Sequence, residues 1–189
     1  MSEVSADPWI FGYGSLMWRP DFPFAERHPA VLRGYHRAFC RYSFHHRGTR
    51  AAPGMVLGLA RGGACLGIAY RLRPEDLAGA LAALDKREGP GYDRRLLPVA
   101  LRGNGKRPAA WVYVPDPTHD SYAHGLSRAR AVELIGTGSG ASGRAADYLR
   151  DVVAQLKLLD TPDPRLEAML AEVEAFLRNG GVPEPRPQE

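Results

Sequence analysis

Turn-forming residues break the apolar segments of this chain at short intervals over its first two thirds. The chain has 21 glycines and 16 prolines among 189 residues. The clearest breaks are Gly62-Gly63, Gly89-Pro90-Gly91 and Gly103-Asn104-Gly105. Glycine tolerates backbone angles that other residues avoid, and proline lacks an N–H, so both tend to end regular elements. An all-helical bundle is therefore disfavoured, and short strands joined by turns are predicted.

The segments between these breaks have the composition of strands. From Tyr35 onward the side chains alternate, which predicts a half-buried strand. One of its faces carries Ala38, Cys40, Tyr42 and Phe44, and the other carries Arg37, Phe39, Arg41 and Ser43. The other predicted strands are Trp9–Phe11, Met55–Ala60, Leu66–Leu72, Leu96–Leu101 and Ala109–Val114. Gly62-Gly63 predicts a hairpin turn between the second and the third of these segments.

Apolar residues recur at helical spacing in one segment between the strands and in further segments after Pro115. Pro74 stands at a suitable first position for the first helix, which ends at Gly89. The later helices are predicted over Ala129–Ile135, from Ala145 to Leu156, and from Pro164 to Asn179.

The order of these elements, with strands first and helices later, predicts an α+β fold. Its sheet is expected to be a small β-barrel or a curved mixed sheet, surrounded by helices and followed by a helical C-terminal part. The chain has no internal repeat and no linker, so residues 9–179 are predicted to form a single domain. Residues 1–8 are predicted to be a polar extension and residues 180–189 a flexible tail.

The cysteines and the hydropathy predict the compartment. Cys40 and Cys65 are too few for a disulfide framework and lack CxxC spacing, which indicates a reducing compartment and argues against structural zinc. No apolar run approaches the roughly 20 residues of a membrane span. The polar, acidic start lacks the apolar region of a secretory signal. We therefore expect a cytoplasmic protein with no membrane partner.

Basic residues exceed acidic ones by four, and 22 of the 25 basic residues are arginine. Arginines and aromatic residues alternate between Arg33 and Arg50, a mixture that an RNA-binding sheet could use for stacking and phosphate contacts. Half of these aromatics fall on the predicted core face, however, and no RNP-type sequence is present. A nucleic acid is therefore not expected as a partner, although RNA binding stays open as the main non-enzymatic alternative.

Two other patterns have alternative interpretations. The segment from Gly138 to Gly143 satisfies G-x-G-x-x-G before a helix, but the segment before it is helical and the chain lacks the repeated βαβ units of a dinucleotide-binding fold. A loop without a nucleotide is therefore preferred. The pair His45-His46 and the residues His119 and His124 lack metal-binding spacing, so no metal site is predicted.

Two segments could carry chemistry. The run from Gly12 to Leu16 follows a strand, and successive N–H groups in such a tight loop can bind a carboxylate or a developing oxyanion. Glu88 stands where a helix ends at Gly89. A negative charge is disfavoured at a helix C-terminus, so the pKa of Glu88 is expected to rise, which suits a general base. Taken alone, the run from Gly12 to Leu16 is better explained as a glycine turn with Tyr13 packed beneath it, and Glu88 as a surface residue paired with Arg87 or Lys86.

Together these residues resemble the ChaC-like, glutathione-specific γ-glutamylcyclotransferases. The similarity begins with the run Phe11 to Trp18 and continues through most of the chain in the same order and spacing. Its other motifs are Asp21-Phe22-Pro23, Gly34-Tyr35 with Arg37 and Phe39, Ser43 with His46-Arg47-Gly48-Thr49, Pro53-Gly54, Gly67 to Leu72, Leu84-Asp85, Arg87-Glu88, Gly91-Tyr92, Pro115-Asp116-Pro117 with Tyr122, and Ser142-Gly143 with Tyr148-Leu149.

This resemblance implies a fold of the γ-glutamylcyclotransferase type and cleavage of glutathione to 5-oxoproline and cysteinylglycine. Glu88 matches the family's catalytic glutamate and is the expected general base. The residues expected to bind the γ-glutamyl arm are Phe11, Gly12, Tyr13, Gly14, Ser15 and Leu16. Arg37, Arg47 and Tyr122 are weaker candidates for binding the glycine carboxylate or the cysteinyl part. The implied chemistry requires neither a metal nor an organic cofactor.

The sequence departs from the family pattern at two positions. His45 stands where members usually carry an acidic residue, and Ala145 stands where they usually carry Asn. These departures concern the peptide side of the substrate rather than the reaction. Two alternatives therefore stay open: a cyclotransferase for other γ-glutamyl amines or dipeptides, and a non-catalytic module that binds a small molecule or RNA.

Overall fold

The structure is a computed structural model that describes residues 7–181. These residues form two compact units, and neither unit is continuous in sequence. The first contains the chain up to Arg37 and Leu59–Asp116, and the second contains Ala38–Gly58 and the chain from Pro117. Most of the predicted N-terminal extension and tail, residues 1–6 and 182–189, lies outside the described residues. The single domain over residues 9–179 stays a prediction.

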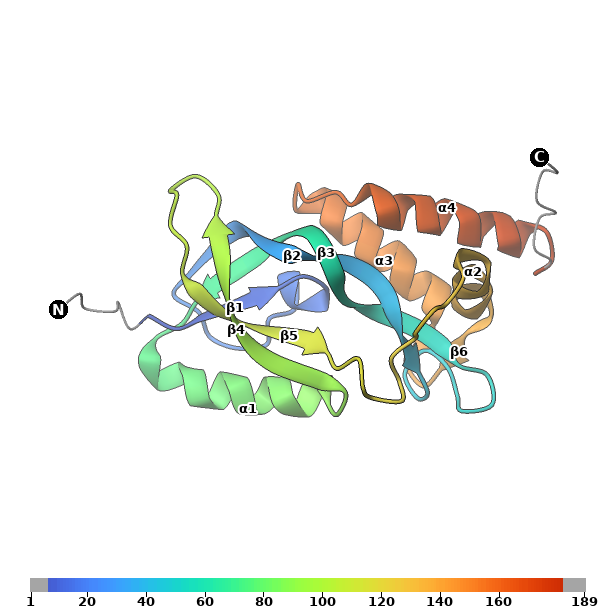
Figure 1. Ribbon diagram of the computed structural model, residues 1–189, viewed down its shortest axis with the longest axis horizontal. Coiled ribbons are helices and arrows are strands. Elements are labelled where there is room, and N and C mark those ends of the chain that lie inside the picture. Colours follow the sequence, from blue (N-terminus) through green and yellow to red (C-terminus); the bar gives the residue numbers. More distant parts are fainter. Residues whose placement is uncertain (1–6, 182–189) are drawn as a thin grey trace. The chain divides into compact units, whose positions relative to one another are not determined.

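A closed barrel organises the strands that the structure describes (Figure 1). Its members, in the order in which they are hydrogen-bonded, are β1 (Trp9–Gly12), β3 (Gly54–Arg71), β2 (Glu26–Ser43), β4 (Tyr92–Leu101) and β5 (Ala109–Pro115). β1 pairs with β3 antiparallel, whereas β1 and β5 close the barrel through a parallel pairing. The sheet is therefore mixed and closed, which confirms the predicted α+β class.

The predicted hairpin at Gly62-Gly63 is wrong, because both segments belong to the single strand β3. Gly62 and Gly63 have φ values of 95° and 70°, which places a local bend inside the strand instead of a turn that ends it. β2 begins nine residues before the predicted start at Tyr35. It contains Gly34 with a φ of 83°, so glycine marks an irregularity inside this strand as well.

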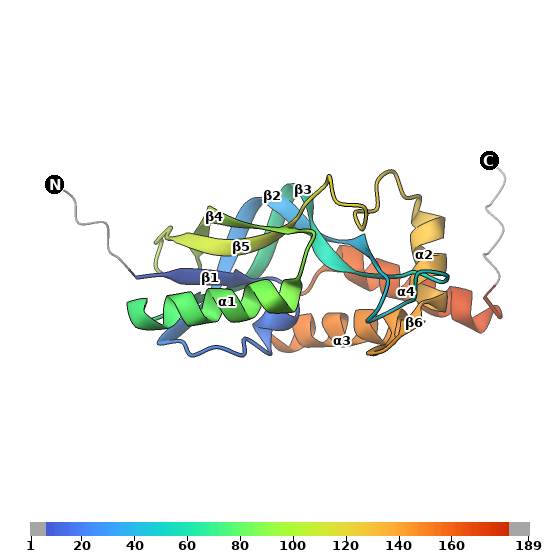
Figure 2. The same ribbon diagram turned by 90° about the horizontal axis from the view of Figure 1, so that it is seen from below.

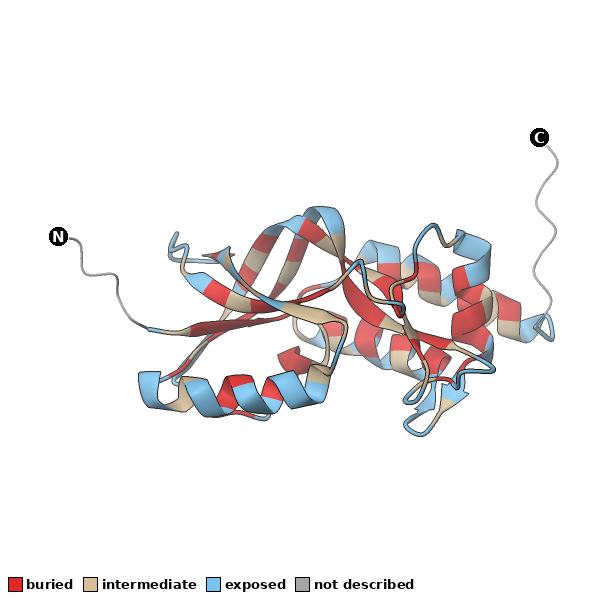
Figure 3. Cartoon of the chain, turned by 60° about the horizontal axis from the view of Figure 1, so that its bottom comes forward, coloured by how far each residue is buried: buried red, intermediate tan, exposed pale blue. Residues whose placement is uncertain are grey.

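One α-helix, α1 (Leu77–Glu88), belongs to the first unit and follows the short 3₁₀ turn η2 (Pro74–Asp76). Figure 2 shows it running beside β1 and β5. The buried residues of the helix are Ala80, Leu81 and Leu84. Figure 3 shows both buried and exposed positions along the helix. Gly89 ends the helix with a φ of 67°, a left-handed conformation that glycine adopts without strain. This confirms the predicted helix and its end.

The second unit contains three α-helices among its described residues: α2 (Arg128–Thr137), α3 (Ala145–Leu158) and α4 (Pro164–Arg178). They pack on one another, and their apolar stripes form the core of the unit. A Cβ at Gly136 would lie 2.6 Å from the Phe176 ring, so this glycine permits the close contact of α2 with α4. In the part of the chain that the structure describes, no helix combines the length and apolarity that crossing a bilayer takes.

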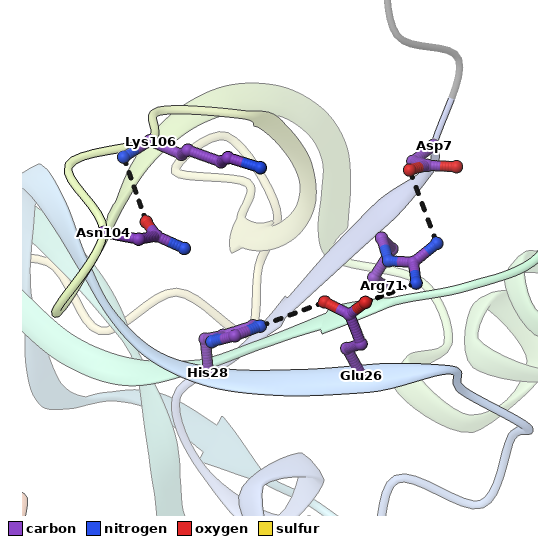
Figure 4. Close-up of polar contacts among 6 residues, drawn as sticks. All are labelled: Asp7, Glu26, His28, Arg71, Asn104 and Lys106. Carbon is purple, nitrogen blue, oxygen red and sulfur yellow. Dashed lines mark hydrogen bonds and ion pairs between the residues drawn. The ribbon is translucent and has the colours of Figure 1, made fainter.

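An ionic cluster joins the start of β2 to the end of β3 (Figure 4). Arg71 donates hydrogen bonds to Glu26 and to Asp7, and the Glu26 carboxylate also contacts His28 Nε2 at 3.2 Å. The hydrogen bond from Arg71, and after it the one from His28, lowers the pKa of Glu26 below its ordinary value of 4.5. The cluster is exposed, so its effect on stability is small.

The contribution of Glu26 to stability is expected to disappear in acid. A carboxyl whose pKa is lowered by folding stabilises the folded state while it is ionised, above pH 4.5, and loses this effect as the pH falls through its folded pKa. The measurement is urea unfolding of the wild type and Glu26→Gln at a series of pH values. We expect the wild type to be more stable near neutral pH and the difference to shrink below pH 4.5. A constant difference would contradict this role.

Candidate active site

The segment after β1 turns back sharply against its own strand and against β3. A Cβ at Gly12 would lie 2.8 Å from the Leu16 Cβ, and a Cβ at Gly67 would lie 2.4 Å from the Gly12 carbonyl oxygen. Real side chains are not found at such distances, so both positions require the absence of a side chain. Glycine therefore lets the chain turn immediately after β1, and it lets β3 pass close beneath the turn.

This turn, residues 12–16, is called the glycine loop below. It leads into the 3₁₀ helix η1 (Ser15–Met17), where Met17 N–H donates to the Gly14 carbonyl at 2.9 Å. Among residues 7–181, the structure shows no hydrogen-bond acceptor for the N–H groups of Gly14, Ser15 and Leu16. Successive main-chain donors of this kind can bind an anionic oxygen.

Arg37 is hydrogen-bonded to the glycine loop. The residue is only 3% exposed, and its Nε donates to the Tyr13 carbonyl at 2.5 Å. Its Nη2 donates to the Leu66 carbonyl on β3 and contacts Met17 Sδ at 3.3 Å. A buried guanidinium needs such partners, because burying it without them is costly. These contacts connect Arg37 to the glycine loop and to β3, and its predicted contact with substrate stays a prediction.

Tyr70, on β3, holds the other end of the loop. Its hydroxyl lies 2.9 Å from the carbonyl oxygens of Leu16 and of Met17, and the side chain is completely buried. Burial raises the pKa of this phenol to about 12, so it keeps its proton and donates it. In the sequence, Tyr70 belongs to the family motif Gly67 to Leu72, but no role was predicted for it, since its partner Leu16 is 54 residues away.

The last turn of α1 is hydrogen-bonded to the glycine loop and the residues after it. Arg87 donates to Ser15 Oγ at 2.8 Å, to the Arg19 carbonyl at 2.8 Å and to Asp21 Oδ2 at 2.9 Å. Glu88, the next residue, is half-buried and is the last residue of the helix. The structure thus ties the helix end that carries Glu88 to the loop predicted to bind substrate.

A second set of contacts fixes the same helix end through β5. The Tyr113 hydroxyl donates to Asp85 Oδ1 at 2.6 Å, and Arg94 donates to Asp85 Oδ2 at 2.7 Å. Burial, and after it the contact with Asp85, raises the pKa of Tyr113, so this hydroxyl also stays protonated. The Tyr113 carbonyl accepts from the Tyr13 hydroxyl at 2.9 Å, which connects α1, β5 and the loop.

Arg47 and Tyr122 belong to the second unit. Arg47 donates to the Ser142 carbonyl at 2.6 Å, and its guanidinium lies 5.0 Å from the centre of the Tyr148 ring. Tyr122 forms an isolated bridge with Arg41, and its ring lies 4.7 Å from that of His124. Within this unit, both residues take part in contacts that stabilise their own segments.

The G-x-G-x-x-G segment, residues 138–143, packs closely against other backbone segments of the second unit. It forms the two-stranded sheet of β6 (Ser139–Gly140) and β7 (Gly143–Arg144). A Cβ at Gly138 would lie 2.5 Å from the Gly54 Cα, and one at Gly140 would lie 2.3 Å from the His45 carbonyl oxygen. These two glycines thus permit close contact with the start of β3 and with the loop between β2 and β3.

Solved structures with the same fold define the class of protein. A glutathione-specific γ-glutamyl cyclotransferase from yeast superposes with a TM-score of 0.80 at 23% identity, over 90% of this chain and 99% of that one. A selenomethionine-labelled crystal structure, also titled as the glutathione-specific yeast enzyme, gives 0.78 at 24% identity, over 90% and 96%. The fold is therefore the γ-glutamylcyclotransferase fold.

Sequence comparison places the chain within that class. The model of the family described as ChaC-like protein matches residues 8–176. The glutathione-specific gamma-glutamylcyclotransferase of Escherichia coli (strain K12) is 38% identical over 172 residues, 89% of this chain and 74% of its own. Glutathione-specific gamma-glutamylcyclotransferase 1 of Mus musculus is 33% identical over 183 residues, 93% of this chain and 82% of its own. The chain belongs to the ChaC-like family.

Proposed function

We propose that this protein cleaves glutathione to 5-oxoproline and cysteinylglycine. The observation that carries the proposal is the set of hydrogen bonds that ties the end of α1, next to Glu88, to the glycine loop. Relatives named glutathione-specific γ-glutamylcyclotransferases, which match most of the chain, support the choice of substrate. We thus combine the reaction of these relatives with two features of the site. The first is the row of N–H donors of Gly14, Ser15 and Leu16, and the second is the end of α1 that carries Glu88.

The reaction exchanges one amide for another and consumes no water. The α-amine of the γ-glutamyl residue attacks the δ-carbonyl carbon and forms the ring of 5-oxoproline. The amide bond to the cysteine nitrogen breaks, and that nitrogen leaves with a proton as the amine of cysteinylglycine. Because both reacting groups belong to one residue, holding that residue bent can supply an effective molarity on the order of 10⁵ to 10⁸ M.

In this proposal the glycine loop holds the bent residue. The N–H groups of Gly14, Ser15 and Leu16 bind either the α-carboxylate or the carbonyl oxygen that becomes negative during the attack. A donor that stabilises such an oxyanion contributes about 2.7 to 4 kcal/mol to lowering the barrier. Phe11, Gly12 and Tyr13 shape the turn that presents these donors. For the cysteinylglycine part of the substrate, Arg47 and Tyr122 stay predictions.

Glu88 is proposed as the group that moves the proton. A free α-amine has a pKa of about 8, so near neutral pH it is mostly protonated and cannot attack. A carboxylate at the helix end accepts this proton and later returns it to the leaving nitrogen. The side chain is half-buried, which leaves it accessible to a substrate while restricting its motion.

The reaction is proposed to take place in the cytoplasm. Cys40 and Cys65 are both buried, and two cysteines without CxxC spacing are typical of a protein from a reducing compartment. Burial raises the pKa of the Cys40 thiol to about 12, so this thiol stays protonated near neutral pH.

Purified protein is expected to release 5-oxoproline and cysteinylglycine from glutathione in equal amounts. Chromatography of the products measures both, with γ-glutamyl-alanine as the competing substrate. We expect a marked preference for glutathione and no effect of a chelator, since the proposed steps use only main-chain donors and a carboxylate. A preference for γ-glutamyl-alanine would instead indicate a cyclotransferase for other γ-glutamyl compounds. Absence of 5-oxoproline from every substrate would indicate a binding module.

A further inference from the structure

Arg87 lies next to the proposed base, yet its guanidinium contacts the glycine loop and the segment after it. Nη1 donates to the Arg19 carbonyl and to Asp21, and Nη2 donates to Ser15 Oγ. The two nitrogens thus bind both ends of the segment from Ser15 to Asp21. The side chain of Arg87 is 28% exposed, so this contact is partly shielded from water.

The contact with Arg87 determines what the Ser15 hydroxyl can do. A serine hydroxyl has one hydrogen to donate and two lone pairs that accept, whereas arginine only donates. Arg87 therefore occupies a lone pair of Ser15, and the hydroxyl hydrogen must point elsewhere. Within residues 7–181 the structure shows no acceptor for this hydrogen. A hydrogen bond from a charged donor also polarises the hydroxyl and makes it a better donor.

Asp21 adds a second indication that this segment is held in one shape. Its φ is 56°, in the left-handed region that residues other than glycine seldom adopt. Asp is among the residues that tolerate this region best, and its carboxylate accepts from Arg87 at 2.9 Å. The fork of the guanidinium reaches Ser15 and Asp21 at once, which the single ammonium of lysine cannot do.

We propose that Arg87 is a positioning residue: it orients the Ser15 hydroxyl so that its hydrogen is donated to an oxygen of the γ-glutamyl arm. This inference rests on the function proposed above. Ser15 then adds a side-chain donor to the main-chain donors of Gly14, Ser15 and Leu16. Arg87 acts through Ser15 and does not touch the substrate.

A double-mutant cycle tests this coupling with the full chain and glutathione. Ser15→Ala and Arg87→Ala are each expected to lower kcat/KM by about 10- to 100-fold, the effect of losing or misorienting one donor. The variant with both changes is expected to be no worse than the poorer single variant, because without the hydroxyl there is nothing left to orient. A double loss equal to the product of the single losses would overturn the proposal.

Two further variants separate positioning from charge and from general damage. Arg87→Lys keeps the positive charge but loses the fork, so kcat/KM is expected to stay reduced, and full recovery would overturn the proposal. Arg128→Ala removes another partly exposed arginine, which binds Glu172 through two hydrogen bonds of 2.9 Å in the second unit. It is the matched control, and its kcat/KM is expected to equal that of the wild type.

Amide hydrogen exchange without substrate provides a measurement that does not depend on turnover. We expect faster exchange over residues 14–21 in Arg87→Ala than in the wild type or Arg128→Ala. If the wild type releases no 5-oxoproline, the proposed function fails, and exchange alone then decides the role of Arg87. Faster exchange confined to this segment would support positioning, and unchanged exchange would overturn it.

Discussion

Replacing Glu88 by glutamine is expected to lower the rate of 5-oxoproline release from glutathione by about 10² to 10⁴-fold, the usual contribution of acid–base catalysis. Glutamine has nearly the same shape, so the last turn of α1 and its contacts through Arg87 and Asp85 should persist. Glutathione binding and thermal stability are therefore expected to change little. Initial rates, together with calorimetric binding, separate the loss of proton transfer from a loss of affinity.

Glu75→Gln is the control for this variant. Glu75 is an exposed acid in η2, which precedes the helix that Glu88 ends, and removing its charge should leave the rate unchanged. Near-native turnover by Glu88→Gln would remove Glu88 from the proposed role. A loss of binding as large as the loss of rate would make it a substrate-binding residue instead.

Adding one methyl group at Gly67 is expected to destabilise the protein by about 1 to 3 kcal/mol or more, as overpacking of a core does. The new Cβ would lie 2.4 Å from the Gly12 carbonyl oxygen and 2.6 Å from the Phe11 ring. The oxygen belongs to β1, which is paired with β3 at this point, so neither chain can retreat without disturbing the pairing. Urea unfolding of Gly67→Ala measures the loss, and activity should fall with it because the glycine loop begins at Gly12.

The same substitution at Gly79 is expected to have the opposite sign. Gly79 lies within α1, and a Cβ there would meet no atom within 4 Å. Alanine is favoured over glycine inside a helix by roughly 0.5 to 1 kcal/mol. Gly79→Ala should therefore be more stable than the wild type by about that amount. If both alanine variants changed stability alike, close packing at Gly67 would not be the cause.

The sequence predicts the elements of this fold well where a periodic pattern ends at a strong turn signal. α1 is an example, since Leu77, Leu81 and Leu84 share one face and Gly89 follows. The prediction from the sequence fails at Gly62-Gly63, because the same pair of glycines can end a strand or bend it. Only pairing with neighbouring strands decides between these outcomes, and that information lies elsewhere in the chain.

The alternating pattern of β2 shows a second limit. It predicts two faces but leaves open which of them is buried. The structure buries the face that carries Arg37, Arg41 and Ser43, with Phe39 among them. The buried guanidinium of Arg41 donates a hydrogen bond to Ser121 Oγ at 2.8 Å. Polar residues inside a fold depend on partners far along the chain, so a hydropathy pattern cannot identify them.

Some residues of the candidate site could likewise be predicted from the sequence, and others could not. The glycine loop and Glu88 could be named from the sequence, because a short motif and a helix end mark them. The residues that hold them, Tyr70, Asp85 and Arg87, could not be given roles. Each acts on a partner that is distant in sequence, as in the contact of Tyr70 with Leu16 or that of Arg87 with Ser15.

The glycine loop is far in sequence from the residues that hold it, and this separation has a consequence for the synthesis of the protein. The loop leaves the ribosome before Arg37, Tyr70 and Arg87, which follow it in the sequence. A nascent chain that stops before Tyr70 contains the whole loop sequence without the groups that shape it. Competence to handle glutathione should therefore arise late in synthesis, and shortened translation products should not deplete the cellular thiol pool.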